Sequence, residues 1–133
     1  MALELTIVTP EQRVLSVQAE EVRLPGVVGG FGVRPGHTPL VAALAAGELI
    51  YITGGTPHRY AVGEGFAEVS EDHVRVLVEE AVRAEELDPA RAASELAEKQ
   101  QKLQSMKPED PAYAAQRAQV ARAAARAQVA GRR

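Results

Sequence analysis

The chain has 133 residues, a formal net charge of −3 and no cysteine. This length fits one compact domain, or a domain of about 90 residues with an appendage. The lack of cysteine excludes a disulfide framework and thiol chemistry, and the longest weakly polar run, residues 39–47, is too short to cross a bilayer.

Short alternating runs separated by turn residues fill residues 1–80. The first, Leu3-Glu4-Leu5-Thr6-Ile7, begins without a basic leader or an apolar signal core, so we expect a soluble, unprocessed chain. Turn signals about every 8–12 residues, among them Gly54-Gly55, indicate an antiparallel sandwich or barrel. The remaining runs lie at residues 14–17, 21–24, 38–44, 48–53, 58–62, 66–69 and 74–78.

The character of the chain changes to helical near residue 87. Asp88-Pro89 combines an N-cap carboxylate with a proline at the first helical position, and Asp110-Pro111 repeats this signal one helix length later. We therefore predict a β-domain over residues 1–86 and a two-helix hairpin over residues 87–133.

The second predicted helix contains ten alanines between Pro111 and Ala130. Alanine favours helix formation, but it buries little apolar surface. Such a hairpin suits an element that docks and undocks, and a permanently packed hairpin is the alternative.

Charge is distributed unevenly between these two parts. Residues 1–88 hold 14 acidic residues and 6 arginines, a net charge of −8, whereas residues 89–133 hold 4 acidic and 9 basic residues, a net charge of +5. The excess of positive charge indicates an acidic partner or an anionic ligand for the C-terminal part. A solvated helix face that keeps the hairpin soluble explains it equally well.

Residue patterns typical of catalysis or metal binding are lacking. The serines have no glycine-flanked elbow, and His37, His58 and His73 have no metal-ligand spacing. The glycines of residues 26–36 are not followed by Lys-Ser/Thr and do not open a helix, so they do not form a phosphate-binding loop. We expect a protein that is not an enzyme and that holds neither a metal nor a cofactor.

Three segments together resemble the epsilon subunit of bacterial F-type ATP synthases: residues 24–41 (LPGVVGGFGVRPGHTPLV), residues 65–69 (GFAEV) and residues 87–92 (LDPARA). The resemblance covers the whole chain, and it implies a flattened antiparallel β-sandwich followed by an antiparallel helical hairpin. One departure is Gly63-Glu64-Gly65, which stands where the family has two adjacent glycines.

The resemblance implies a non-catalytic subunit of the central stalk. Its partners would be the gamma subunit, the c-subunit ring and the alpha/beta catalytic head, at the cytoplasmic face of the bacterial plasma membrane and without membrane insertion. Gly30, Phe31, Arg34 and His37 would face the rotor. The alternative is that residues 35–37 simply form a turn.

The resemblance also implies regulation by the hairpin. In bacterial relatives the hairpin can extend along gamma, and its basic residues meet an acidic loop of the beta subunits and block ATP hydrolysis. Exposed charge pairs contribute about 0–1 kcal/mol each, so several would act together. The residues available for this contact are Lys99, Lys102, Arg117, Arg122 and Arg126, with Arg132 and Arg133 beyond them.

Some bacterial relatives bind ATP on the folded hairpin, and the matching residues here are Leu87, Asp88, Arg91, Ala92, Arg122 and Arg126. The two later arginines, at i and i+4, repel each other by about 0.2–0.5 kcal/mol unless an anion lies between them, and guanidinium groups suit phosphate oxygens. Val82 aligns with a position that is acidic in strong ATP binders, which leaves the affinity open. Asp88 either accepts a hydrogen bond from the amino group of the nucleotide base or caps the helix.

The sequence suggests two alternative functions. A stand-alone ATP sensor would fold its hairpin on the nucleotide. A nucleic-acid binder is disfavoured because the basic second helix has no aromatic residue besides Tyr113 for base stacking, and because the β-domain is acidic.

Overall fold

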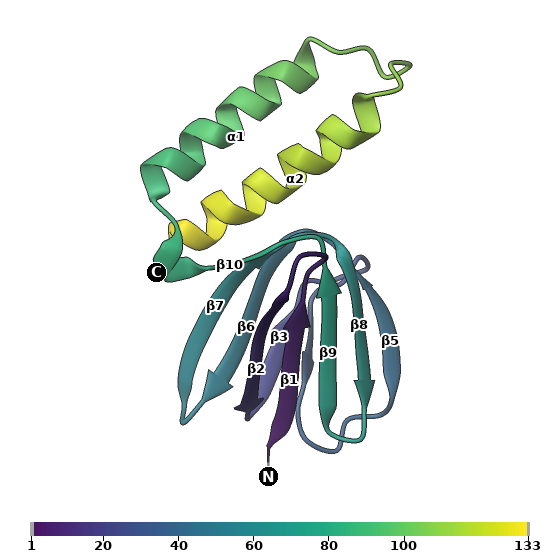
Figure 1. The fold of residues 1–133 in the computed structure, drawn as a ribbon, viewed down its shortest axis with the longest axis vertical. Helices are drawn as coiled ribbons and strands as arrows, with labels where there is room; N and C mark the ends of the chain where they lie inside the picture. Colours follow the sequence, from purple (N-terminus) through teal and green to yellow (C-terminus); the bar gives the residue numbers. More distant parts are fainter. Residues whose placement is uncertain (1, 133) are drawn as a thin grey trace.

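The computed structural model describes residues 2–132, and within them the chain forms two five-stranded sheets, a 3-10 turn and two α-helices (Figure 1). One sheet has the strand order β2-β1-β9-β8-β5 and the other β10-β7-β6-β3-β4. The strands are β1 (Leu3–Val8), β2 (Arg13–Ala19), β3 (Glu21–Leu24), β4 (Phe31–Val33), β5 (Leu40–Leu44), β6 (Gly47–Thr53), β7 (Thr56–Val62), β8 (Gly65–Ser70), β9 (His73–Val78) and β10 (Ala81–Arg83). The 3-10 turn η1 is Ala84–Glu86, and the helices are α1 (Pro89–Gln104) and α2 (Tyr113–Ala130).

The two sheets enclose the main core of the sandwich. Alternation along β1 and β9 turns Leu5 and Val76 inward, where both are fully buried, and the inner residues of β6 and β7 meet them from the second sheet. The predicted sandwich is therefore confirmed. The strand pairing differs from the predicted antiparallel arrangement in one respect. β1 pairs antiparallel with β2 but parallel with β9, which is the last strand of this sheet in chain order.

Two short strands lie where the sequence pattern predicts none. β4 lies inside the glycine-rich segment, and β10 follows the last predicted run. Each has three residues and gains its strand conformation by pairing with β3 or β7. Alternation over three residues is too short a signal to indicate a strand.

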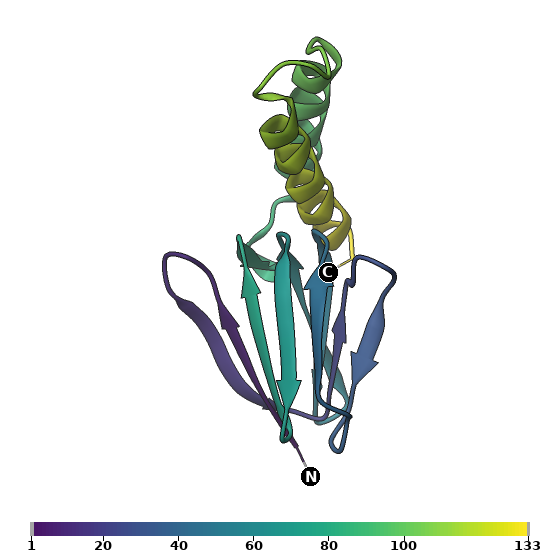
Figure 2. The same cartoon turned by 90° about the vertical axis from the view of Figure 1, so that its right-hand side faces the viewer.

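The two helices form an antiparallel hairpin at one end of the sandwich, with the C-terminal half of α2 against β6 and β7 (Figures 1 and 2). A second, smaller cluster of buried residues joins α2 to the sandwich: Ala61, Ala84, Leu87, Ala92, Ala125, Val129 and Ala130. Neither described helix is long and apolar enough to span a membrane.

The two predicted helix starts differ in the structure. Asp88 caps α1 as expected, because its Oδ1 accepts a hydrogen bond from the Ala90 amide at 3.1 Å. At the second start, Asp110 Oδ1 likewise accepts a hydrogen bond from the Ala112 amide, at 2.8 Å, but the Tyr113 amide donates to the Asp110 carbonyl at 2.9 Å and forms a turn first. The helix expected at Pro111 therefore begins two residues later, at Tyr113.

Candidate functional site

A small pocket lies at the base of the hairpin, where η1 leads into α1 and the end of α2 returns to the sandwich. Its volume is about 240 Å3. The residues that line it are Glu86, Leu87, Asp88, Arg91, Ala92, Glu95 and Arg126. The fold thus brings Arg126 together with the predicted nucleotide-binding segment of residues 87–92, although Arg126 lies 34 positions after Ala92 in the chain.

Arg122 lies one turn before Arg126 and is directed to the sandwich instead of lining this pocket. Its Nε and Nη2 donate hydrogen bonds to the two carboxylate oxygens of Glu64, at 2.9 and 2.7 Å. This pairing lowers the pKa of Glu64 and raises the pKa of Arg122. Charge-assisted bonds in this two-pronged geometry are among the strongest available to side chains.

Arg126 also has carboxylate partners. Its Nη1 donates to Glu80, and its Nη2 lies 3.9 Å from Glu95, which in turn accepts from Arg91 Nε at 3.1 Å. The expected repulsion between Arg122 and Arg126 is therefore relieved by protein carboxylates. An incoming phosphate would have to compete with them.

The carboxylate of Asp88 is exposed and already accepts from the Ala90 amide. The capping alternative is thus realised in this structure. Asp88 also lines the pocket, so a role in binding is compatible with the cap.

The basic residues expected to contact the beta subunits fall into two groups. Lys102 and Arg117 are exposed on the hairpin. Lys99 donates to Gln119 Oε1 at 3.1 Å, whereas Arg122 and Arg126 face the sandwich. Arg132 donates to Glu48 at 3.0 Å, and Arg133 lies outside the described residues.

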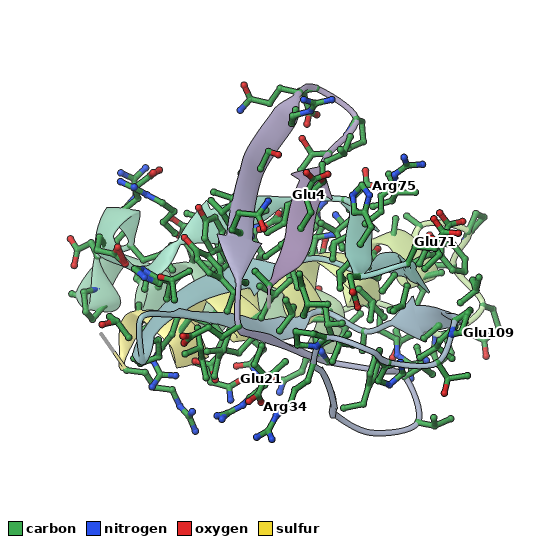
Figure 3. All side chains as sticks on the ribbon, turned by 90° about the horizontal axis from the view of Figure 1, so that it is seen from below. Glu4, Glu21, Arg34, Glu71, Arg75 and Glu109 are labelled. Atoms are coloured by element: carbon green, nitrogen blue, oxygen red, sulfur yellow. The ribbon has the colours of Figure 1, made fainter. Side chains whose placement is uncertain are left out.

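The four residues expected at the rotor do not form one cluster. Gly30 and Phe31 line a groove of about 690 Å3 beside β3 and β4, which Gln128 of α2 reaches. Arg34 and His37 line a separate hollow of about 300 Å3. Arg34 donates to Glu21 at 3.2 Å, and the two side chains lie together in Figure 3.

Residues 35–37 form a turn, as the alternative interpretation of this segment expected. The His37 amide donates to the Arg34 carbonyl at 3.1 Å, and the Gly36 amide donates to Asp72 Oδ1 at 2.6 Å. The second bond ties this loop to the β8–β9 turn. A turn does not preclude a contact, since the loop remains largely exposed.

Sequence reasoning missed an exposed apolar band on the outer face of the first sheet. Phe66 and Leu77 are directly paired across β8 and β9 and are 58% and 45% exposed. The band comprises Val41, Phe66 and Leu77 on this face and extends to Val27 and Val28 of the β3–β4 connection, which line one hollow with Val41. Alternation was the signal that could have revealed it, because the inward residues of β9 are Val74, Val76 and Val78, which places Leu77 outside.

Groups of three or more metal-ligating side chains do not occur among residues 2–132. The histidines instead make local contacts. His58 stacks on Tyr51 with ring centroids 4.7 Å apart, and His73 Nε2 lies 3.2 Å from Thr6 Oγ1.

Comparison with known proteins adds to this geometry. The model of the ATP synthase delta/epsilon chain beta-sandwich domain matches residues 2–84. The ATP synthase epsilon chain of Anaeromyxobacter dehalogenans (strain 2CP-1) is 52% identical over 132 residues, covering 99% of this chain and 100% of the relative. That of Geobacter metallireducens is 42% identical over 130 residues, covering 98% and 94%.

Solved structures show the same fold. A chain in the cryo-EM structure of the Euglena gracilis mitochondrial ATP synthase, an assembly of OSCP, F1 and c-ring, superposes with a TM-score of 0.76 at 28% identity, covering 90% of this chain and 75% of that one. A chain of the Tetrahymena thermophila mitochondrial central stalk and c-ring superposes with a TM-score of 0.61 at 12% identity. The chain belongs to the family of ATP synthase delta and epsilon chains.

Proposed function

We propose that the chain is a non-catalytic subunit of the central stalk of an F-type, proton-translocating ATP synthase. In this role it couples rotation of the c ring and the gamma subunit to the alpha/beta catalytic head, at the cytoplasmic face of the bacterial plasma membrane. Membership in the family supports this proposal, as does the likeness to a chain from an assembly of F1 and c-ring. The observation that carries it is the apolar band.

The apolar band suits permanent contact with another protein. Val28 is fully exposed and Val41 is 69% exposed, and with their neighbours they line a hollow of about 590 Å3. Exposed apolar side chains that cluster in this way are typical of interaction sites. We assign the band to gamma, and the loop of Arg34 and His37 at the other end of the sandwich to the c ring.

The hairpin is the regulatory element of this proposal. Lys102 and Arg117 remain exposed in the docked hairpin, and release of α2 adds Arg122 and Arg126. The released helices would bring these charges to an acidic loop of the beta subunits and inhibit ATP hydrolysis.

ATP is the proposed regulatory ligand of the hairpin, at the pocket of Leu87, Asp88, Arg91, Ala92 and Arg126. Two features support it: the pocket itself, and the arginines of both helices, Arg91 and Arg126, that line it. The docked pocket, at about 240 Å3, is smaller than the usual ligand pocket of about 300–1,000 Å3. Binding therefore requires Glu95 to move away from Arg91 and Arg126.

Co-purification with gamma tests the proposed function. A Phe66→Asp, Leu77→Asp variant places charge in the apolar band without touching the core, so the sandwich should fold but lose gamma. The matched control is Glu68→Gln, because Glu68 lies on the same face of β8 and its pair with Arg75 is long, at 4.0 Å. Retention of gamma by the folded double variant would contradict the assignment of the band.

A further inference from the structure

Two glutamates of the sandwich lie side by side beneath α2. Glu64 is in the β7–β8 turn and Glu80 is in the β9–β10 connection. Backbone hydrogen bonds join these two segments: the Gly63 amide donates to the Glu80 carbonyl at 2.9 Å, and the Glu79 amide donates to the Glu64 carbonyl at 3.0 Å. The backbone positions of both glutamates are therefore held by hydrogen bonds within the sandwich itself.

The arginines of α2 match this pair of carboxylates. Residues four apart lie on one face of a helix, and Arg122 meets Glu64 while Arg126 meets Glu80. The side chains of Arg122 and Arg126 are only 23% and 17% exposed in these pairs. We call Arg122–Glu64 and Arg126–Glu80 the docking pairs.

The apolar contact between α2 and the sandwich is comparatively weak. Its buried α2 members are Ala125, Val129 and Ala130. The sandwich contributes the buried Ala61 and the partly buried Ala46 and Val82. Alanine side chains bury little area, and the hydrophobic stabilisation scales with buried area. The orientation of α2 on the sandwich thus depends largely on the docking pairs, with Arg132–Glu48 at the C-terminal end as a further link.

We propose that Glu64 and Glu80 act as built-in anionic partners that dock α2 on the sandwich without a bound nucleotide. An anionic ligand can then bind Arg122 and Arg126 only by displacing these carboxylates. The consequence for inhibition rests on the proposed function of the hairpin: the arginines that inhibit hydrolysis are withheld while the docking pairs hold.

Substitution of Glu64 should leave the β7–β8 turn intact. The neighbouring Gly65 is required by space, since a Cβ there would lie 1.9 Å from the Leu77 carbonyl oxygen. Residue 64 has no such restriction and a negative φ. Both Glu64→Gly and Glu64→Gln should therefore fold.

The test measures hairpin docking in the full chain. Because the chain has no cysteine, Thr38→Cys and Ala114→Cys, both at exposed positions, accept a donor and an acceptor dye for energy transfer. Without nucleotide, we expect a docked population that falls in Glu64→Gln and falls further in Glu64→Gln with Glu80→Gln. Loss of one charged pair should raise the ratio of released to docked chains about tenfold.

Charge reversal and a control make the test specific. Glu64→Arg should release the hairpin, and Glu64→Arg with Arg122→Glu should restore docking. The second reversal would not restore docking if Glu64→Arg had simply disrupted the fold. Glu68→Gln should leave docking unchanged. A wild-type chain that docks only after ATP is added, or a Glu64→Gln, Glu80→Gln chain that stays docked, would overturn the inference. These readouts use the isolated chain, so their failure is separate from any failure to bind gamma or to inhibit hydrolysis.

Discussion

Arg122 and Glu64 lie 58 residues apart in the chain and meet through two parallel hydrogen bonds, Nε–Oε1 at 2.9 Å and Nη2–Oε2 at 2.7 Å. This pairing joins the last helix to a turn of the sandwich. The carboxylate must be ionised to accept both bonds, so the contact links hairpin docking to pH.

Acid should release the hairpin. The bond from Arg122 lowers the pKa of Glu64 below its ordinary value of 4.5. The stabilisation is therefore fully present above pH 4.5 and is lost as the pH falls through the lower pKa of the docked state. Glu79 and Glu80 also face Arg122 and favour its charged form.

Energy transfer in the dye-labelled chain, recorded between pH 7 and pH 3, measures this release. The Glu64→Gln chain should show a smaller change, because its residue 64 does not titrate. Identical profiles for the two chains would show that other carboxyl groups control docking.

Gly65 should be essential for stability. A Cβ at this position would lie 1.9 Å from the Leu77 carbonyl oxygen and 2.8 Å from the Val78 Cα, both backbone atoms. Gly65→Ala should therefore lower the free energy of unfolding by about 1–3 kcal/mol or more. Gly30→Ala is the matched control, since its nearest contact would be 3.6 Å. Urea unfolding compares the two, and equal midpoints would refute the steric argument.

Much of the sandwich follows from local pattern. Alternation identified the inward faces of β1 and β9, and Asp88-Pro89 marked the start of α1. The sequence pattern did not predict β4 and β10, because three-residue strands depend on pairing with distant segments. The late start of α2 reflects a turn at Asp110 that propensity alone does not distinguish from a helix cap.

The candidate site was predictable only on the helical side. Arg122 and Arg126 stand out by their spacing and by the mutual repulsion that it creates. Their partners Glu64 and Glu80 are 58 and 46 residues away, and no periodicity connects a residue in a turn with one on a later helix. The apolar band likewise appears only once adjacent strands place Phe66 beside Leu77.

Asp88 has a structural role that can be separated from nucleotide binding. Asp88→Ala removes the acceptor for the Ala90 amide and should cost about 1 kcal/mol of stability. Asp88→Ser retains a capping oxygen but removes the charge, so stability should be nearly kept. Thermal unfolding of both variants, with ATP calorimetry on Asp88→Ser, makes the separation. If ATP binding is unchanged in Asp88→Ser, the carboxylate acts as a cap alone.

Removal of the Glu95 charge should strengthen ATP binding. This carboxylate pairs with Arg91 at 3.1 Å and approaches Arg126 at 3.9 Å, so it competes with phosphate for both guanidinium groups. Glu95→Gln should tighten binding about tenfold, the effect of one charged hydrogen bond. Glu98→Gln, an exposed change on the same helix, serves as the control. Calorimetric titration of the isolated chain gives both affinities, and weaker binding in Glu95→Gln would contradict competition.

Removal of residues 89–133 should raise ATP hydrolysis by the assembled enzyme while leaving gamma bound. The apolar band lies wholly on the sandwich, whereas the charges assigned to inhibition lie on the hairpin. Lys102→Gln with Arg117→Gln should give a partial rise, because exposed charges act weakly and additively, at about 0–1 kcal/mol each. ATPase assays on complexes reconstituted with each form measure the effect. Hydrolysis that is unchanged on truncation, with gamma still bound, would leave the sandwich as a stalk component and remove the regulatory role of the hairpin.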